Sequence, residues 1–90
     1  ERHLNDAGNY SFATYPAAQI KQMCLEVAAE KPDAIAIFCT NFRGAGIAQE
    51  VEEETGIMVL DSVSTALWKS MRVAGADPAR IKGWGRMFDV

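Results

Sequence analysis

Residues 34–44 read AIAIFCTNFRG and pass directly from apolar side chains into a polar turn. From Ala34 to Cys39 the stretch shows no alternation of polar and apolar residues, a pattern typical of a short strand covered on both faces. Strands of that kind occur mainly in parallel sheets. The stretch therefore predicts a buried parallel strand that delivers Cys39, Thr40 and Asn41 to one edge of a sheet.

Upstream of this strand the pattern indicates a helix. Apolar residues recur at helical spacing between positions 20 and 28, and Pro16 suits the first turn of a helix. We expect this helix to span residues 16–30. The segments 3–12 and 81–88, near the two ends of the chain, are candidates for additional strands.

Downstream, two further helices enclose a second short strand. Gly56 is placed to end the first of these helices, and residues 57–60 form the next apolar strand. Asp61, Ser62 and Ser64 are candidates to cap the last helix, which Gly75 ends. Alternating helices and strands form right-handed βαβ units. We predict an α/β fold with a parallel sheet and helices on both faces, in a single domain over residues 1–90.

Composition and charge argue against several classes of function. Apolar residues make up 49 % of the chain and charged residues 23 %, as in ordinary globular proteins. The net charge of −3, with scattered Lys and Arg, argues against nucleic acid as a partner. No apolar run is long enough to cross a membrane, so we expect no membrane contact and a cytoplasmic location. With one histidine and two separated cysteines, we expect no metal site.

Polar side chains follow both predicted strands at the point where each strand ends. Cys39, Thr40 and Asn41 follow the first strand, and Asp61, Ser62 and Ser64 follow the second. Ligands of open parallel sheets bind beyond these carboxyl ends. The helix starts expected next would attract anions and lower the pKa of a nearby thiol. The pattern predicts a site for a carboxylate or phosphate, with Cys39 as a nucleophile or acid–base group.

These residues also have structural interpretations. A cysteine after an apolar run is often a small core residue, and this interpretation is favoured above all for Cys24, on the apolar side of the first predicted helix. Thr40 and Asn41 could form a turn and cap the following helix. The acidic run 52–54 is typical of a solvated helix face.

The run 33–43, DAIAIFCTNFR, resembles a known enzyme superfamily when it is taken with the Glu-rich helix and with SVSTALWKSMRVAG at 62–75. It is similar to the C-terminal half of the aspartate/glutamate racemase superfamily, in the branch of maleate cis-trans isomerase and arylmalonate decarboxylase. The likeness spans about residues 5–88. Members are enzymes without cofactors, built from two similar α/β halves with the active site between them.

The resemblance implies roles for particular residues. Cys39 would be the catalytic cysteine of this half, and Thr40 and Asn41 would bind a substrate carboxylate. Asn9 resembles the family's carboxylate-binding asparagine, with Asn5 as the alternative. The chain would then be the C-terminal half of a longer enzyme, inactive by itself, whose N-terminal half completes the site.

The resemblance also implies a reaction. We expect a cysteine-dependent isomerase without a cofactor, similar to maleate isomerase, with a small dicarboxylate or amino acid as substrate. Racemisation of aspartate or glutamate and decarboxylation of an arylmalonate are alternatives within the superfamily. From a different class, the chain could be a non-catalytic α/β domain that binds a ligand or pairs with itself. We expect a homo-oligomer, because a half of this size would leave an apolar face exposed.

Overall fold

A computed structural model describes residues 1–90, apart from the side chain of Asn9. Two short strands, β1 (Ala34–Ile37) and β2 (Met58–Asp61), pair in parallel and form the sheet. Their register places Ile35 beside Val59 and Ile37 beside Asp61. The predicted α/β class with a parallel sheet is confirmed.

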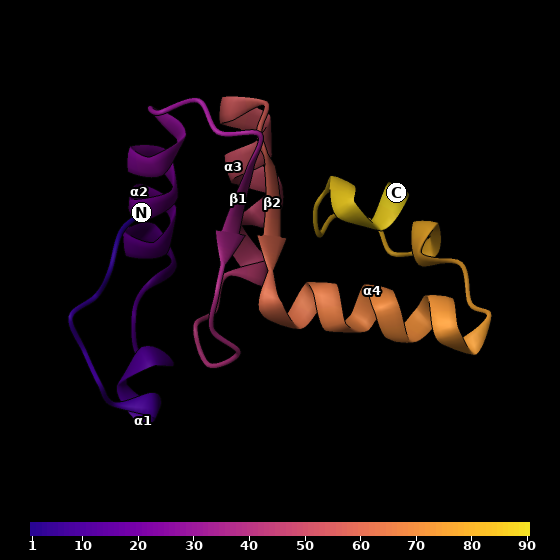
Figure 1. The fold of residues 1–90 in the computed structure, drawn as a ribbon, viewed down its shortest axis with the longest axis horizontal. Helices are drawn as coiled ribbons and strands as arrows, with labels where there is room; N and C mark the ends of the chain where they lie inside the picture. The colour runs from indigo at the N-terminus through magenta and orange to yellow at the C-terminus, as the bar shows by residue number, and fades with distance from the viewer.

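Helices precede, connect and follow the two strands (Figure 1). The α-helices are α1 (Asn9–Phe12), α2 (Ala17–Ala28), α3 (Ala48–Thr55) and α4 (Ser62–Ala74), and the 3-10 helices are η1 (Ala45–Ile47), η2 (Pro78–Arg80) and η3 (Arg86–Asp89). Helix α2 lies on the β1 side of the sheet, whereas the C-terminal segment with η3 lies on the β2 side (Figure 1). Among the described helices, none has the length and apolar character needed to span a membrane.

The helix boundaries follow the local signals in the sequence. Helix α2 begins after Pro16, whose backbone is extended. Helix α3 ends at Gly56 and α4 ends at Gly75, both in the left-handed region with φ of 74° and 82°. The Asp61 carboxylate accepts hydrogen bonds of 3.0 Å from two N–H groups in the first turn of α4. The predicted helix ends at Gly56 and Gly75 are confirmed, and Asp61 is the one of the three cap candidates that caps α4. Helix α2 ends at Ala28, two residues before the predicted end.

The core lies against one face of the sheet. Ile35 and Ile37 of β1 and Val59 of β2 are buried there with apolar side chains from α2, η1 and α3. Ala34 and Ala36, which alternate with the isoleucines, are exposed. The expectation that this strand is covered on both faces is therefore wrong for the described chain. An unbroken apolar run allows both faces of a strand to be buried, but the packing of the helices decides which face is covered.

The candidate strands near the chain ends are also wrong. The segment 3–12 contains irregular backbone and the short helix α1. The segment 81–88 contains irregular backbone and most of η3, and its Gly83 and Gly85 have φ of 86° and 112°, outside the strand region. The first strand is likewise shorter than predicted, because it ends at Ile37.

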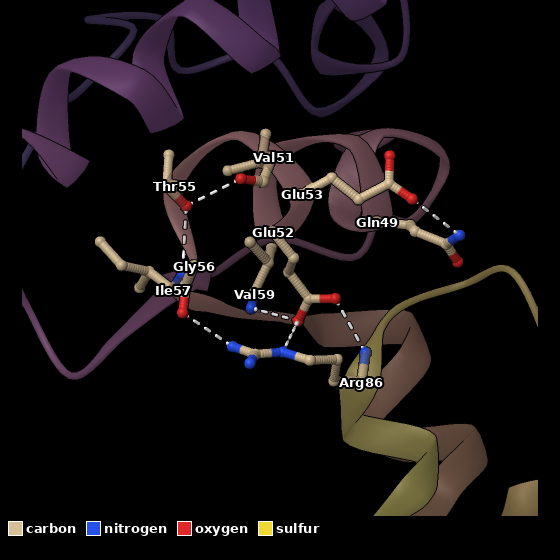
Figure 2. Close-up of polar contacts among 9 residues, drawn as sticks. All are labelled: Gln49, Val51, Glu52, Glu53, Thr55, Gly56, Ile57, Val59 and Arg86. Carbon is tan, nitrogen blue, oxygen red and sulfur yellow. Dashed lines mark hydrogen bonds and ion pairs between the residues drawn. The ribbon is translucent and has the colours of Figure 1, made fainter.

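Glu52 attaches the C-terminal segment to the outer edge of β2 (Figure 2). Its side chain is buried, and its two oxygens accept hydrogen bonds from the N–H of Val59 at 3.0 Å and of Arg86 at 2.8 Å. The guanidinium of Arg86 donates to the carbonyl of Gly56 at 3.0 Å. The solvated interpretation of the acidic run holds for Glu53, which is exposed, but is wrong for Glu52. Successive helix residues point in different directions, so one member of the run faces inward.

Candidate functional site

Cys39 follows β1 by two residues and lines an open cleft of about 910 Å³. The walls of this Cys39 cleft are the N-terminal arm, which we define as residues 1–6, together with side chains of α2, β1 and the loop after β1. All four residues of β1 line the cleft, together with Phe38 and Cys39. The thiol is half-buried. The sequence therefore placed Cys39 correctly, beyond the carboxyl end of a parallel strand and beside open space.

The second cysteine has a different environment. Cys24 lies in α2, is 4 % exposed and belongs to the hydrophobic core. Burial raises the pKa of the Cys24 thiol above its usual value of 9.0, which keeps it protonated and unreactive. Neither cysteine forms a disulfide. Both cysteines line the cleft, and Cys39 is the more exposed of the two.

Thr40 and Asn41 form an exposed turn directly after Cys39, and neither is among the residues that line the cleft. The expectation that they open the next helix is wrong. The 3-10 helix η1 intervenes, and α3 begins only at Ala48, with no side-chain cap. Their predicted contact with a substrate carboxylate would therefore rest on this turn and not on a helix start.

Gly44 packs the end of the Cys39 loop, residues 39–44, against the ends of both strands. A Cβ atom at this position would lie 2.6 Å from Cδ1 of Ile37 and 2.8 Å from Oδ1 of Asp61, so a larger residue would displace these side chains. Ser62 joins the same strand ends, because its hydroxyl donates to the carbonyl of Ile37 at 2.8 Å. The carboxyl ends of β1 and β2 therefore meet, as predicted. The sequence offered two glycines in this turn and no means of choosing between them.

The N-terminal arm brings one candidate asparagine to the cleft. Asn5 adopts a left-handed backbone with φ of 57° and lines the same cleft as Cys39. The side chain of Asn9, the other candidate, lies outside the described residues. The structure thus places Asn5 and Cys39 around one space.

A cluster around Asp6 fixes the arm. Its carboxylate accepts hydrogen bonds from the N–H of Gly8 at 2.9 Å, from the hydroxyl of Ser11 at 2.7 Å and from the hydroxyl of Tyr15 at 3.0 Å. These donors, first the Gly8 N–H, lower the pKa of Asp6 below its usual 3.8. The hydrogen bond between Tyr15 and Asp6 raises the pKa of Tyr15 above its usual 10.0. The ring of Tyr15 meets Phe42 edge to face at 6.0 Å. Sequence reasoning missed this cluster, because its members show no motif.

Sequence comparison with known proteins identifies the family of this chain. The sequence profile of the arylmalonate decarboxylase family matches residues 4–88. The chain therefore belongs to the arylmalonate decarboxylase family, which confirms the resemblance to the racemase superfamily.

One curated relative is similar over nearly the whole chain. The arylmalonate decarboxylase of Bordetella bronchiseptica is 29 % identical over 90 residues. The alignment covers 98 % of this chain but 38 % of that relative, so the chain spans less than half of its length. No solved structure matches the chain significantly.

Proposed function

We propose that this chain supplies one half of the active site of an enzyme without a cofactor, which acts at a carbon next to a carboxylate. Cys39 is the proposed proton donor. The observation that carries the proposal is the half-exposed thiol of Cys39 at the end of β1, on an open cleft. Family membership favours decarboxylation of an arylmalonate as the reaction. Isomerisation of maleate, our leading expectation from the sequence, becomes the alternative.

The proposed reaction needs a proton and an environment that favours loss of charge. The bond between the α-carbon and one carboxylate breaks, CO₂ leaves, and the electron pair stays on an enediolate that includes the second carboxylate. The Cys39 thiol donates its proton to the α-carbon, and the resulting thiolate takes a proton from water. Apolar side chains of α2 and β1 line the cleft and would hold the aryl group. Their exclusion of water favours the loss of a charged carboxylate.

The remaining carboxylate needs hydrogen-bond donors that are aimed at the enediolate oxygens. We propose Asn5, Thr40 and Asn41 for this role, with Asn9 as the alternative to Asn5. Asn5 has the strongest support, because it lines the cleft with Cys39. The other wall of the site belongs, in this proposal, to an N-terminal half related to the part of the Bordetella relative that the alignment leaves uncovered. The chain alone would then be inactive.

The test is the Cys39→Ala variant of the full-length protein, with Ser70→Ala as the control, because Ser70 is exposed on α4 and does not line the cleft. Turnover of phenylmalonate in D₂O should give phenylacetate with one deuterium at the α-carbon. Loss of a positioned proton donor should lower kcat by about 10²–10⁴-fold in Cys39→Ala. The control should keep its activity, provided that circular dichroism shows it folded. Activity of Cys39→Ala within tenfold of wild type on phenylmalonate, maleate, aspartate and glutamate would refute the catalytic role.

Self-association is a second candidate function, from a different class. Phe38 is 95 % exposed and Ala36 lies bare on the open face of the sheet. We propose that a second copy of the chain covers this face and forms a homo-oligomer. Sedimentation velocity should then give a dimer for the wild type and a monomer for Phe38→Asp. A monomeric wild type at concentrations of about 100 μM, far above the Kd of a stable dimer, would contradict self-association.

A further inference from the structure

We propose that Tyr15 is a positioning residue that holds two walls of the Cys39 cleft in place. The inference rests on the proposed function of Cys39. Tyr15 itself is not among the residues that line the cleft. Its hydroxyl donates to Asp6 at 3.0 Å, and its ring meets Phe42 at 6.0 Å with an interplanar angle of 78°. Asp6 and Phe42 both line the cleft, from opposite segments of the chain.

On the side of the N-terminal arm, the contact acts through a single carboxylate. Asp6 accepts hydrogen bonds from Gly8, Ser11 and Tyr15. The first two lie within five residues of Asp6 and organise the arm locally, whereas Tyr15 stands just before α2 and packs against the core. The Tyr15 hydroxyl therefore ties the local turn to the folded body. Asn5 precedes Asp6 directly, so its place in the cleft depends on the same tie.

On the side of the loop, the contact acts through Phe42. The edge-to-face geometry of the two rings is the favoured one for aromatic pairs. The carbonyl of Phe42 also accepts the N–H of Gly44 at 2.7 Å, and Gly44 is wedged between the strand ends. The loop from Cys39 to Gly44 is thus held by two contacts, the packing of Gly44 against the strand ends and the ring contact of Phe42 with Tyr15. Because Cys39 is only three residues from Phe42, a shift of the ring displaces the thiol.

The Tyr15→Phe variant of the full-length protein separates the two contacts, because it removes the hydroxyl and keeps the ring. We expect KM for phenylmalonate to rise about fivefold, as expected for one lost hydrogen bond, with kcat within twofold of wild type. Tyr10→Phe is the matched control, because Tyr10 is 88 % exposed and should leave both constants unchanged. A merely structural Tyr15 would lower the thermal midpoint without this split between KM and kcat.

Asp6→Asn and the double variant test whether Tyr15 acts through Asp6. If both act through one hydrogen bond, the double variant should raise KM no more than the larger single effect. Additive effects, or a Tyr15→Phe variant with unchanged KM, would overturn the proposal.

The rate at which iodoacetamide alkylates Cys39, followed by mass spectrometry, gives a readout that needs no turnover. The rate should rise at least threefold in Tyr15→Phe as the arm loosens. An unchanged rate would refute the positioning role even in an active enzyme. A raised rate in a protein without activity on any tested carboxylate would support positioning while refuting the proposed reaction.

Discussion

Replacing Glu52 by alanine should destabilise the chain by about 3 kcal/mol. The dominant loss is the hydrogen bond to the buried N–H of Val59, because a buried donor left unpaired costs about 1–3 kcal/mol and a bond to a charged acceptor contributes about 1.5–3 kcal/mol. The bond to the N–H of Arg86 is only partly buried, so water replaces much of it. The ion pair at 3.9 Å adds little, because the Arg86 side chain is 54 % exposed.

The assay is thermal unfolding followed by circular dichroism. A loss of about 3 kcal/mol should lower Tm by roughly 12–24 °C in a domain of this size. Glu53→Ala is the matched control, because Glu53 belongs to the same acidic run and is exposed, with one 3.2 Å contact to Gln49. Its effect should stay within about 0.5 kcal/mol. In hydrogen exchange, the amide of Val59 should lose protection only in Glu52→Ala. Equal effects of the two substitutions would refute the buried attachment.

Two further predictions concern the Cys39 loop and the arm. Gly44→Ala should destabilise the chain by about 1–3 kcal/mol in urea unfolding, because its Cβ would overlap side chains at the strand ends. Gly46→Ala is the control, because its Cβ meets open space, and its effect should stay within about 0.5 kcal/mol. Equal unfolding midpoints of the two variants would contradict the close packing of Gly44. The contact between Asp6 and Tyr15 should contribute its full stabilisation of the folded state between pH 3.8 and pH 10.0. This stabilisation should be lost as pH falls through the lowered pKa of Asp6 and as pH rises through the raised pKa of Tyr15. Spectrophotometric titration should show one tyrosine with a pKa raised above 10.0, and the shift should shrink in Asp6→Asn, because the contact with Asp6 is its largest cause and burial the second. An undiminished shift in that variant would exclude Asp6 as the main cause.

Local signals in the sequence predicted the elements whose boundaries depend on neighbouring residues. Gly56 and Gly75 end helices because they adopt left-handed backbones, and Asp61 caps α4 with its own side chain. The segment 81–88 behaved differently, because its conformation depends on a distant partner. Glu52 holds the C-terminal segment from 34 residues away, and its sequence context is the same as that of its solvated neighbours.

The candidate site divides in the same way. That Cys39 lies beyond a strand end follows from a pattern of consecutive residues, and the structure agrees. The place of the N-terminal arm in the cleft does not follow from the sequence pattern, because Tyr15 contacts both the arm and the loop after β1. No periodicity or motif connects Tyr15 with Asp6 or with Phe42, since the geometry arises only when α2 packs against β1. The choice between Asn9 and Asn5 stays a prediction, because the side chain of Asn9 lies outside the described residues.

The two edges of the sheet are finished differently, and this asymmetry locates the site. A strand edge exposes backbone groups that must find partners or water. On the β2 side, Glu52 satisfies Val59 and η3 packs against the strand, so this edge is closed (Figure 2). On the β1 side, the whole strand lines the open cleft, and none of the described residues of β2 does. The strand that leads to Cys39 is therefore also the strand that lines the cleft. In the proposed enzyme, a substrate at this thiol would lie in the cleft that β1, the N-terminal arm and α2 line.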